Sequence, residues 1–180
     1  MVAIVPYRAT WAAEFARIDR RLSRVLGSRA LRIDHIGSTS VPGLAAKDVI
    51  DVQVTVARLE DADPLAEAGF RAEPFLLDHV PPGSPDDERE WRKRLFNLPD
   101  GERRANIHVR QQGRTNQRYA LLFRDYLRAH SSAAQAYGRL KLQLARELAD
   151  PAAYPDVKDP ACDLIWIAAE EWAASIGWTL

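Results

Sequence analysis

The sequence is poor in cysteine and lacks long apolar runs. Cys162 is the single cysteine among 180 residues, so no disulfide can form within the chain. The longest apolar runs, such as residues 164–169, fall far short of the ~20 residues that span a bilayer. The first residues, MVAIVPYRATW, lack the charged and then apolar layout of a signal peptide. These absences predict a cytoplasmic protein that is not inserted in a membrane.

The chain also has no excess of charge of either sign. Lys plus Arg and Asp plus Glu both number 25, which gives a formal net charge of zero. No chain-wide field would therefore attract DNA, RNA or an anionic membrane. An anionic ligand must instead be held by a local group of cations. The sequence contains no G-x-x-x-x-G-K-[ST] stretch, which argues against a P-loop kinase.

Length and apolar periodicity predict one α/β (α+β) domain over residues 1–180. At 47% hydrophobic composition, a chain of this size can bury one core. Apolar spacing predicts helices and alternation predicts strands. The proline-rich, acidic segment 78–88 is predicted to be a mobile loop. The expected elements are a helix at 10–27 capped by Thr10, a strand at 31–36, a helical turn through 44–46, a strand at 48–56, a brief helix at 61–69, a strand near Phe70, a hairpin of 91–98 with 104–110, and helices at 116–130, after 131–132, and from Asp159-Pro160 onwards.

A Gly-Ser pair follows the first predicted strand. Glycine lets a backbone approach a phosphate closely, and the amides and hydroxyl of such a turn donate hydrogen bonds to phosphate oxygens. On the next strand, Asp51 and Gln53 are two residues apart, so we expect their side chains to face one cleft. A carboxylate in that position is suited to Mg²⁺ in phosphoryl chemistry. Gly37, Ser38 and Asp51 therefore predict a site for a metal and a phosphate.

A longer pattern surrounds these residues. Residues 34–47 read DHIGSTSVPGLAAK and are followed by VIDV at 49–52, NIHV at 106–109 and FRDYLR at 123–128. This pattern resembles the signature of the GrpB-like family, and the resemblance extends over nearly the whole chain. It implies a nucleotidyltransferase-like fold, with a mixed β-sheet and helices packed on it. Some relatives resemble domains fused to dephospho-coenzyme A kinase, where such a domain would assist folding.

The resemblance also implies which residues bind phosphate. It places Lys47 beside the Gly-Ser turn, and Arg124 and Lys141 on later helices that reach the same ligand. Lys158 matches another family position, where it either completes an anion pocket or covers apolar surface. The predicted phosphate- or nucleotide-binding residues are Gly37, Ser38, Thr39, Lys47, Arg124 and Lys141.

The metal site implied by the superfamily is altered here. Its members carry two acids on one strand and a third on a later strand, whereas this sequence has Gln53 and His108 in place of two of them. Gln is a poor Mg²⁺ ligand, and neutral His favours softer ions such as Mn²⁺. We expect Asp51, His108 and Gln53 to be the catalytic residues, and Asp51, His108 and His35 to be the ligands of a divalent metal, Mg²⁺ or Mn²⁺. His35 or His108 would act as general base.

These residues support a leading hypothesis and two rivals. The leading hypothesis is a nucleotide-binding protein that transfers a nucleotidyl group from a nucleoside triphosphate to an acceptor that the sequence does not identify. The first rival is a non-catalytic accessory or folding-assistance module with a degenerate metal site, which binds a nucleotide or another phosphorylated small molecule. The second, nucleic-acid binding through the Arg-rich hairpin, is disfavoured by the zero net charge. Cys162 has no evident catalytic partner and is predicted to be structural.

Overall fold

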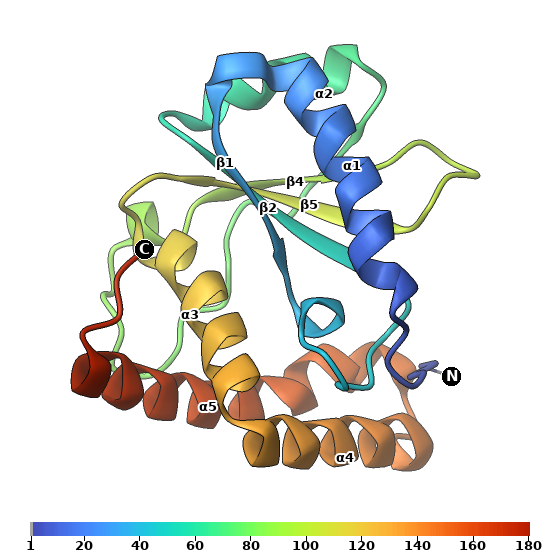
Figure 1. Cartoon of the computed structure of the whole chain (residues 1–180), viewed down its shortest axis with the longest axis vertical. Coiled ribbons are helices and arrows are strands. Elements are labelled where there is room, and N and C mark those ends of the chain that lie inside the picture. Colours follow the sequence, from blue (N-terminus) through green and yellow to red (C-terminus); the bar gives the residue numbers. More distant parts are fainter. Residues whose placement is uncertain (1) are drawn as a thin grey trace.

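The computed structural model describes residues 2–180, which form a five-stranded mixed sheet and five α-helices (Figure 1). These elements confirm the predicted mixed α/β class. Within residues 2–180, none of the helices combines the length and the apolar character needed to cross a membrane. The strands are β1 (Ala30–Ile36), β2 (Ile50–Val56), β3 (Arg71–Glu73), β4 (Lys93–Asn97) and β5 (Ala105–Gln111), and the helices are α1 (Thr10–Leu26), α2 (Asp63–Glu67), α3 (Thr115–Ala129), α4 (Ser131–Glu147) and α5 (Tyr154–Ile176).

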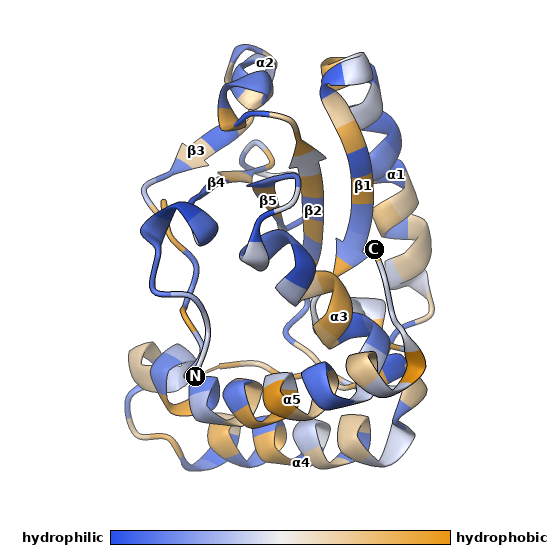
Figure 2. Ribbon diagram, turned by 90° about the vertical axis from the view of Figure 1, so that its left-hand side faces the viewer, coloured by the Kyte–Doolittle hydropathy of each residue, from blue (hydrophilic) through white to orange (hydrophobic). Residues whose placement is uncertain are grey.

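The sheet has the strand order β1-β2-β5-β4-β3. β2 pairs antiparallel with β1 and parallel with β5, and β4 and β5 form the predicted antiparallel hairpin. Helices α1 and α2 pack on one face of the sheet, and α3 packs on the other. Seen from the side in Figure 2, α4 and α5 run alongside each other below the sheet.

Strand β2 separates an apolar face from a polar one. Alternate residues of this strand, Ile50, Val52, Val54 and Val56, are fully buried in the core that α1 covers. Because side chains alternate along a strand, Asp51, Gln53 and Thr55 face the side of α3. The site described below lies on this second side.

Two predicted helix starts are wrong. Thr10 is already inside α1, and Ala9 occupies the cap position without a side-chain hydrogen bond. Helix α5 begins at Tyr154, well before Asp159, and Pro160 lies inside it. Pro155 explains the earlier start, because proline in the first turn presets φ and lacks only an amide that would be unpaired there.

The turn after β1 depends on Gly37. Gly37 has a φ of +66°, and a Cβ on it would lie 2.9 Å from Asp51 Cβ and collide with the Asp51 carboxylate. Both the backbone conformation and the close packing therefore require glycine. A 3₁₀ turn at Ser38–Ser40 follows, and Ser40 Oγ donates to Gly37 O at 2.6 Å. The predicted helical turn is shorter than expected and does not reach 44–46, because residues 44 and 45 are not helical and Ala46 forms an isolated bridge with Val5.

The predicted loop at 78–88 is anchored at its first residue. The Asp78 carboxylate accepts hydrogen bonds from Lys93 Nζ at 2.6 Å and from Arg110 Nε at 2.7 Å. Arg110 also donates to Gln53 Oε1 at 2.7 Å, which ties the loop to β2. Burial alone would raise the pKa of Asp78, but the charges of Arg110 and Lys93 hold it well below its usual range. The next residue, His79, contacts Asp163 of α5 at 2.8 Å.

We expect Asp78→Asn to lower the free energy of unfolding by about 3 kcal/mol, because it leaves two buried cations without their counter-ion. The lowered pKa means that this stabilisation is present above the unfolded value of 3.8 and is lost as the pH falls below it. Wild type and variant should therefore converge in acid. Urea unfolding followed by tryptophan fluorescence measures both effects. Asp87→Asn, which breaks an exposed pair with Arg89, is the control and should change little. An equal loss in both variants would contradict the anchor.

The packing of Gly37 on Asp51 can be tested against a second glycine. Gly43 also has a positive φ, +79°, but nothing lies within 4 Å of a Cβ added there. We expect Gly43→Ala to cost about 1 kcal/mol of backbone strain. Gly37→Ala should cost at least about 1 kcal/mol more, because Asp51 must also move. Chemical denaturation measures the difference, and equal losses would show that Asp51 does not pack on the turn.

Candidate functional site

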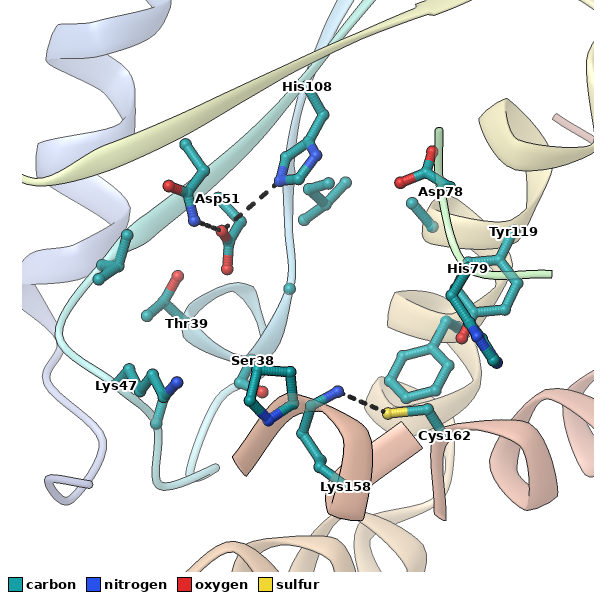
Figure 3. Close-up of a pocket in the computed structure, with 18 of the residues that line it drawn as sticks. Ser38, Thr39, Lys47, Asp51, Asp78, His79, His108, Tyr119, Lys158 and Cys162 are labelled. Carbon is teal, nitrogen blue, oxygen red and sulfur yellow. Dashed lines mark hydrogen bonds and ion pairs between the residues drawn. The ribbon is translucent and has the colours of Figure 1, made fainter. Parts of the chain in front are cut away.

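A cavity of about 540 Å³ lies between the sheet and helices α3, α4 and α5 (Figure 3). Figure 3 shows Asp51 and His108 on one side, and Lys158 and Cys162 on the other. Most of the predicted site residues meet here. Those that line the cavity are Gly37, Ser38, Thr39, Lys47, Asp51, His108 and Lys141, whereas Gln53, His35 and Arg124 do not line it.

Asp51 and His108 lie together at the sheet wall of the cavity. Asp51 Oδ1 accepts a hydrogen bond from Asn106 Nδ2 at 2.8 Å, and His108 Nε2 lies 3.8 Å from the same oxygen. Burial lowers the pKa of His108, and the charges of Arg110 and Lys93 add to this effect against the attraction of Asp51. The imidazole is therefore neutral at pH 7. Its Nδ1 has no hydrogen-bond partner among the described residues.

Gln53 faces the same side as Asp51, as predicted from their spacing, but it lies underneath α3. Its side chain is fully buried, and its amide donates to Gln117 O of α3 at 3.0 Å while accepting from Arg110. Both ends of the amide are thus engaged within the protein. Its predicted catalytic role has no support from this placement.

His35 lies on the opposite face of the sheet from Asp51. It pairs with Val52, whose side chain belongs to the apolar face, and residues directly opposite in an antiparallel pair share a face. The ring stacks on Phe15 with a centroid distance of 4.8 Å, and Nε2 lies 2.9 Å from Thr39 Oγ1. Burial lowers its pKa to about 4. The predicted metal set of Asp51, His108 and His35 is therefore not assembled.

The remaining donors do not replace that set. Across residues 2–180, no group of three or more His, Cys, Asp or Glu side chains is placed to hold a metal ion. The sheet wall offers one carboxylate, Asp51, and one imidazole, His108. Mg²⁺ takes an octahedral shell of oxygen atoms, so these residues do not fit the metal centre that the resemblance implies.

Arg124 supports the turn at residues 37–40 from behind instead of facing the cavity. It donates to His35 O at 3.1 Å and lies 3.3 Å from Asp34 Oδ1. Arg128, one helical turn further along α3, donates twice to Ser40 O, at 2.8 and 3.0 Å. The two arginines of the FRDYLR stretch therefore hold the backbone on either side of Gly37.

Lys141 reaches the same turn from α4. Its Nζ donates to Ser38 Oγ at 2.8 Å and to Ala45 O at 2.5 Å, and only 3% of the residue is exposed. Gly138 allows this approach, since a Cβ there would lie 3.3 Å from Leu44 Cδ1. Burial and the charge of Lys158 lower the pKa of Lys141 to about 7.

Two further lysines complete the cationic part of the cavity. Lys47 Nζ lies 4.2 Å from the ring centroid of Tyr154, and burial followed by the charge of Lys158 lowers its pKa. Lys158 Nζ lies 3.0 Å from Asp159 Oδ1 and 3.1 Å from Cys162 Sγ. In the described part of the chain, ion pairs of lysine are formed by Lys93 and Lys158, and Lys47 and Lys141 form none.

Several lining residues were not predicted as part of the site. Asp78, Lys93 and Arg110 form a polar cluster with one net positive charge in the cavity wall, and Tyr119, Phe123 and Tyr137 provide aromatic surface. The sequence could have indicated Asn106, because it lies two residues before His108 on one strand and belongs to the NIHV stretch. No local pattern in the sequence indicated Asp78, because its partners are distant in sequence. Cys162 was predicted to be structural, and it lies between Lys158 and the Tyr137 hydroxyl, which is 3.4 Å away.

Comparisons with known proteins agree with the resemblance in the motifs. The chain is 38% identical to a dephospho-CoA kinase of Mycolicibacterium paratuberculosis over 98% of its own length and 48% of the relative's. It is 35% identical to a UPF0157 protein of Streptomyces coelicolor over 79% of this chain and 70% of that one. The chain thus spans about half the length of the dephospho-CoA kinases that it matches.

Structural comparison gives the same family. The crystal structure of the conserved protein GrpB from Enterococcus faecalis has a TM-score of 0.74 and 29% identity, over 94% of this chain and 99% of that one. A cytoplasmic RNA terminal U-transferase has a TM-score of 0.45 and 15% identity, over 79% of this chain and 41% of that one, a likeness too weak to carry an argument. A family model described as GrpB protein matches residues 1–166, and the chain therefore belongs to the GrpB family.

Proposed function

We propose that this protein binds a nucleotide or another phosphorylated small molecule in the cavity between the sheet and helices α4 and α5. One observation carries the proposal. The sequence has four lysines, Lys47, Lys93, Lys141 and Lys158, and all four line this cavity. The other side-chain cations among the 25 Lys and Arg residues are arginines. Since buried charges are normally paired, the unpaired ammonium group of the buried Lys141, with the exposed Lys47 on the same cavity wall, calls for an anion from a ligand.

The shape and chemistry of the cavity suit the two parts of such a ligand. A phosphate would lie at the Gly37 turn, within reach of the Ser38 hydroxyl and Lys141. Tyr119, Phe123 and Tyr137 line the cavity with aromatic surface on which a base or another apolar group could pack. A volume of about 540 Å³ lies within the usual range for small-molecule sites.

Nucleotidyl transfer is a narrower prediction than binding. It depends on Asp51 and on His108, whose neutral imidazole is able to accept a proton from an acceptor hydroxyl. A divalent metal would supply charge neutralisation of the phosphates in such a reaction. The donor set at the sheet wall does not fit Mg²⁺, so the proposal is one of binding.

Calorimetric titration of the purified chain with ATP, GTP, CTP and UTP tests this proposal. We expect Lys141→Met to weaken binding about 10- to 100-fold, because a hydrogen bond to a charged group contributes about 1.5–3 kcal/mol. Arg139→Met removes an exposed cation from the same helix, so it is the matched control and should leave affinity unchanged. If none of the four triphosphates, inorganic phosphate and pyrophosphate binds, the proposal is wrong.

A second candidate function follows from the length of the relatives. The region that matches this chain makes up about half of the M. paratuberculosis dephospho-CoA kinase. This arrangement favours a non-catalytic module that assists the folding of a kinase partner. Co-expression of this chain with the remaining half of that relative should raise the soluble yield of that half. An unchanged yield, relative to co-expression with an unrelated soluble protein, would count against this candidate.

A further inference from the structure

Sites for nucleoside phosphates commonly use a divalent cation to neutralise the phosphate oxygens. In this cavity, ammonium groups occupy the positions around the phosphate turn. We propose that the cavity binds the doubly charged terminal phosphate of its ligand without a divalent cation, through Lys47, Lys141 and Lys158. This inference rests on the proposed function and adds the mode of recognition.

The balance of charge around the cavity supports this mode. Five cationic side chains line it, Lys47, Lys93, Arg110, Lys141 and Lys158, against two acids, Asp51 and Asp78. Asp159 pairs with Lys158, which leaves a surplus of two positive charges when Lys141 is protonated. A phosphate monoester dianion carries a matching charge, whereas an added divalent cation would increase the surplus.

The acids are also badly placed to hold a cation. Asp78 is engaged with Lys93 and Arg110, so its charge is already compensated. Asp51 is the one remaining carboxylate on the wall, and the nearby lysine charges would repel a metal ion bound to it. Figure 3 shows Lys47 and Lys158 approaching the region of Ser38 from different parts of the chain.

The charge of Lys158 already acts against the protonated forms of Lys47 and Lys141 in the absence of an anion. After burial, the charge of Lys158 is the next cause of the lowered pKa of both Lys47 and Lys141. A bound dianion would relieve this repulsion and favour the protonated form of each amine. The cluster is held in place, because Gly138 lets α4 pack closely on the turn and Lys141 bonds to Ser38 and Ala45.

Titration with ATP in EDTA and in excess Mg²⁺ tests the mode of recognition. We expect ATP to bind in EDTA at least as tightly as in Mg²⁺, since the metal masks phosphate charge. Binding in Mg²⁺ or Mn²⁺ but not in EDTA would overturn this inference and leave the proposed function intact. If ATP, the other three triphosphates, inorganic phosphate and pyrophosphate all fail to bind in EDTA, Mg²⁺ and Mn²⁺, both the inference and the proposed function are wrong.

Asp51→Asn gives opposite results under the two modes. If lysines alone hold the phosphate, removing the nearby negative charge should tighten ATP binding in EDTA by about twofold or more. If Asp51 holds a required metal, the same variant should lose binding. Lys158→Met should weaken binding in EDTA at least about fivefold, and Arg139→Met should not. Circular dichroism and urea unfolding establish whether each variant is folded. If Asp51→Asn does not fold, the titration of the wild-type protein in EDTA alone tests whether binding requires a metal.

The pH dependence gives an independent readout. The charged and titratable groups that face Lys141 are Asp51 from β2, Tyr137 from α4, and Lys158 and Cys162 from α5. The terminal phosphate of ATP is fully ionised above about pH 7.5. Any change in affinity above this pH therefore arises from groups of the protein. Because the pKa of Lys141 is about 7 without ligand, affinity in EDTA should fall from about pH 7.5 to 9, by up to about tenfold per unit. An affinity that stays constant over this range would overturn the part assigned to Lys141.

Discussion

The alternation of side chains along β2 is the constraint on which both sides of the molecule depend. Even-numbered residues from Ile50 to Val56 close the core under α1, so the odd-numbered residues must face α3. Where α3 covers the strand, Gln53 is fully buried and bonds to a helix carbonyl. Two residues before Gln53, Asp51 lies beyond the part of the strand that α3 covers, and its side chain lines the cavity. A single strand thus supplies both a core and a site.

Buried cations in this protein are stabilised in two ways. Lys93 and Arg110 share the carboxylate of Asp78, which anchors a long loop to the sheet. Lys141 donates only to neutral oxygens, and burial shifts its pKa. The first arrangement stabilises the fold at neutral pH because each buried cation has a carboxylate partner within the protein. The second leaves electrostatic free energy that a bound anion would recover.

Local patterns in the sequence predicted the strands, the hairpin and the amphipathic helices, because each depends on neighbouring residues. They also placed Gly37 and Asp51 at one site. The sequence could not predict which face of the sheet His35 occupies, since this depends on the register of β1 against β2, which pairs His35 with Val52. The hydrogen bonds of Asp78 could not be predicted either, because its partners lie on β4 and β5, which are distant in sequence. Lys158 joined the cavity only through the packing of α5, which begins at Tyr154 and not where Asp159-Pro160 suggested.

The use of lysine at this cavity has a physical reason in a chain whose other side-chain cations are arginines. An arginine buried without a counter-ion stays charged, because its pKa is too high to be shifted across the neutral range. A buried lysine can lose its proton, and the pKa of Lys141 is close to the pH at which that happens. Lys141 can therefore remain buried at low cost without an anion and would gain its charge on binding the proposed anion. Arg124 and Arg128, which bond to backbone oxygens behind the turn, never face that change.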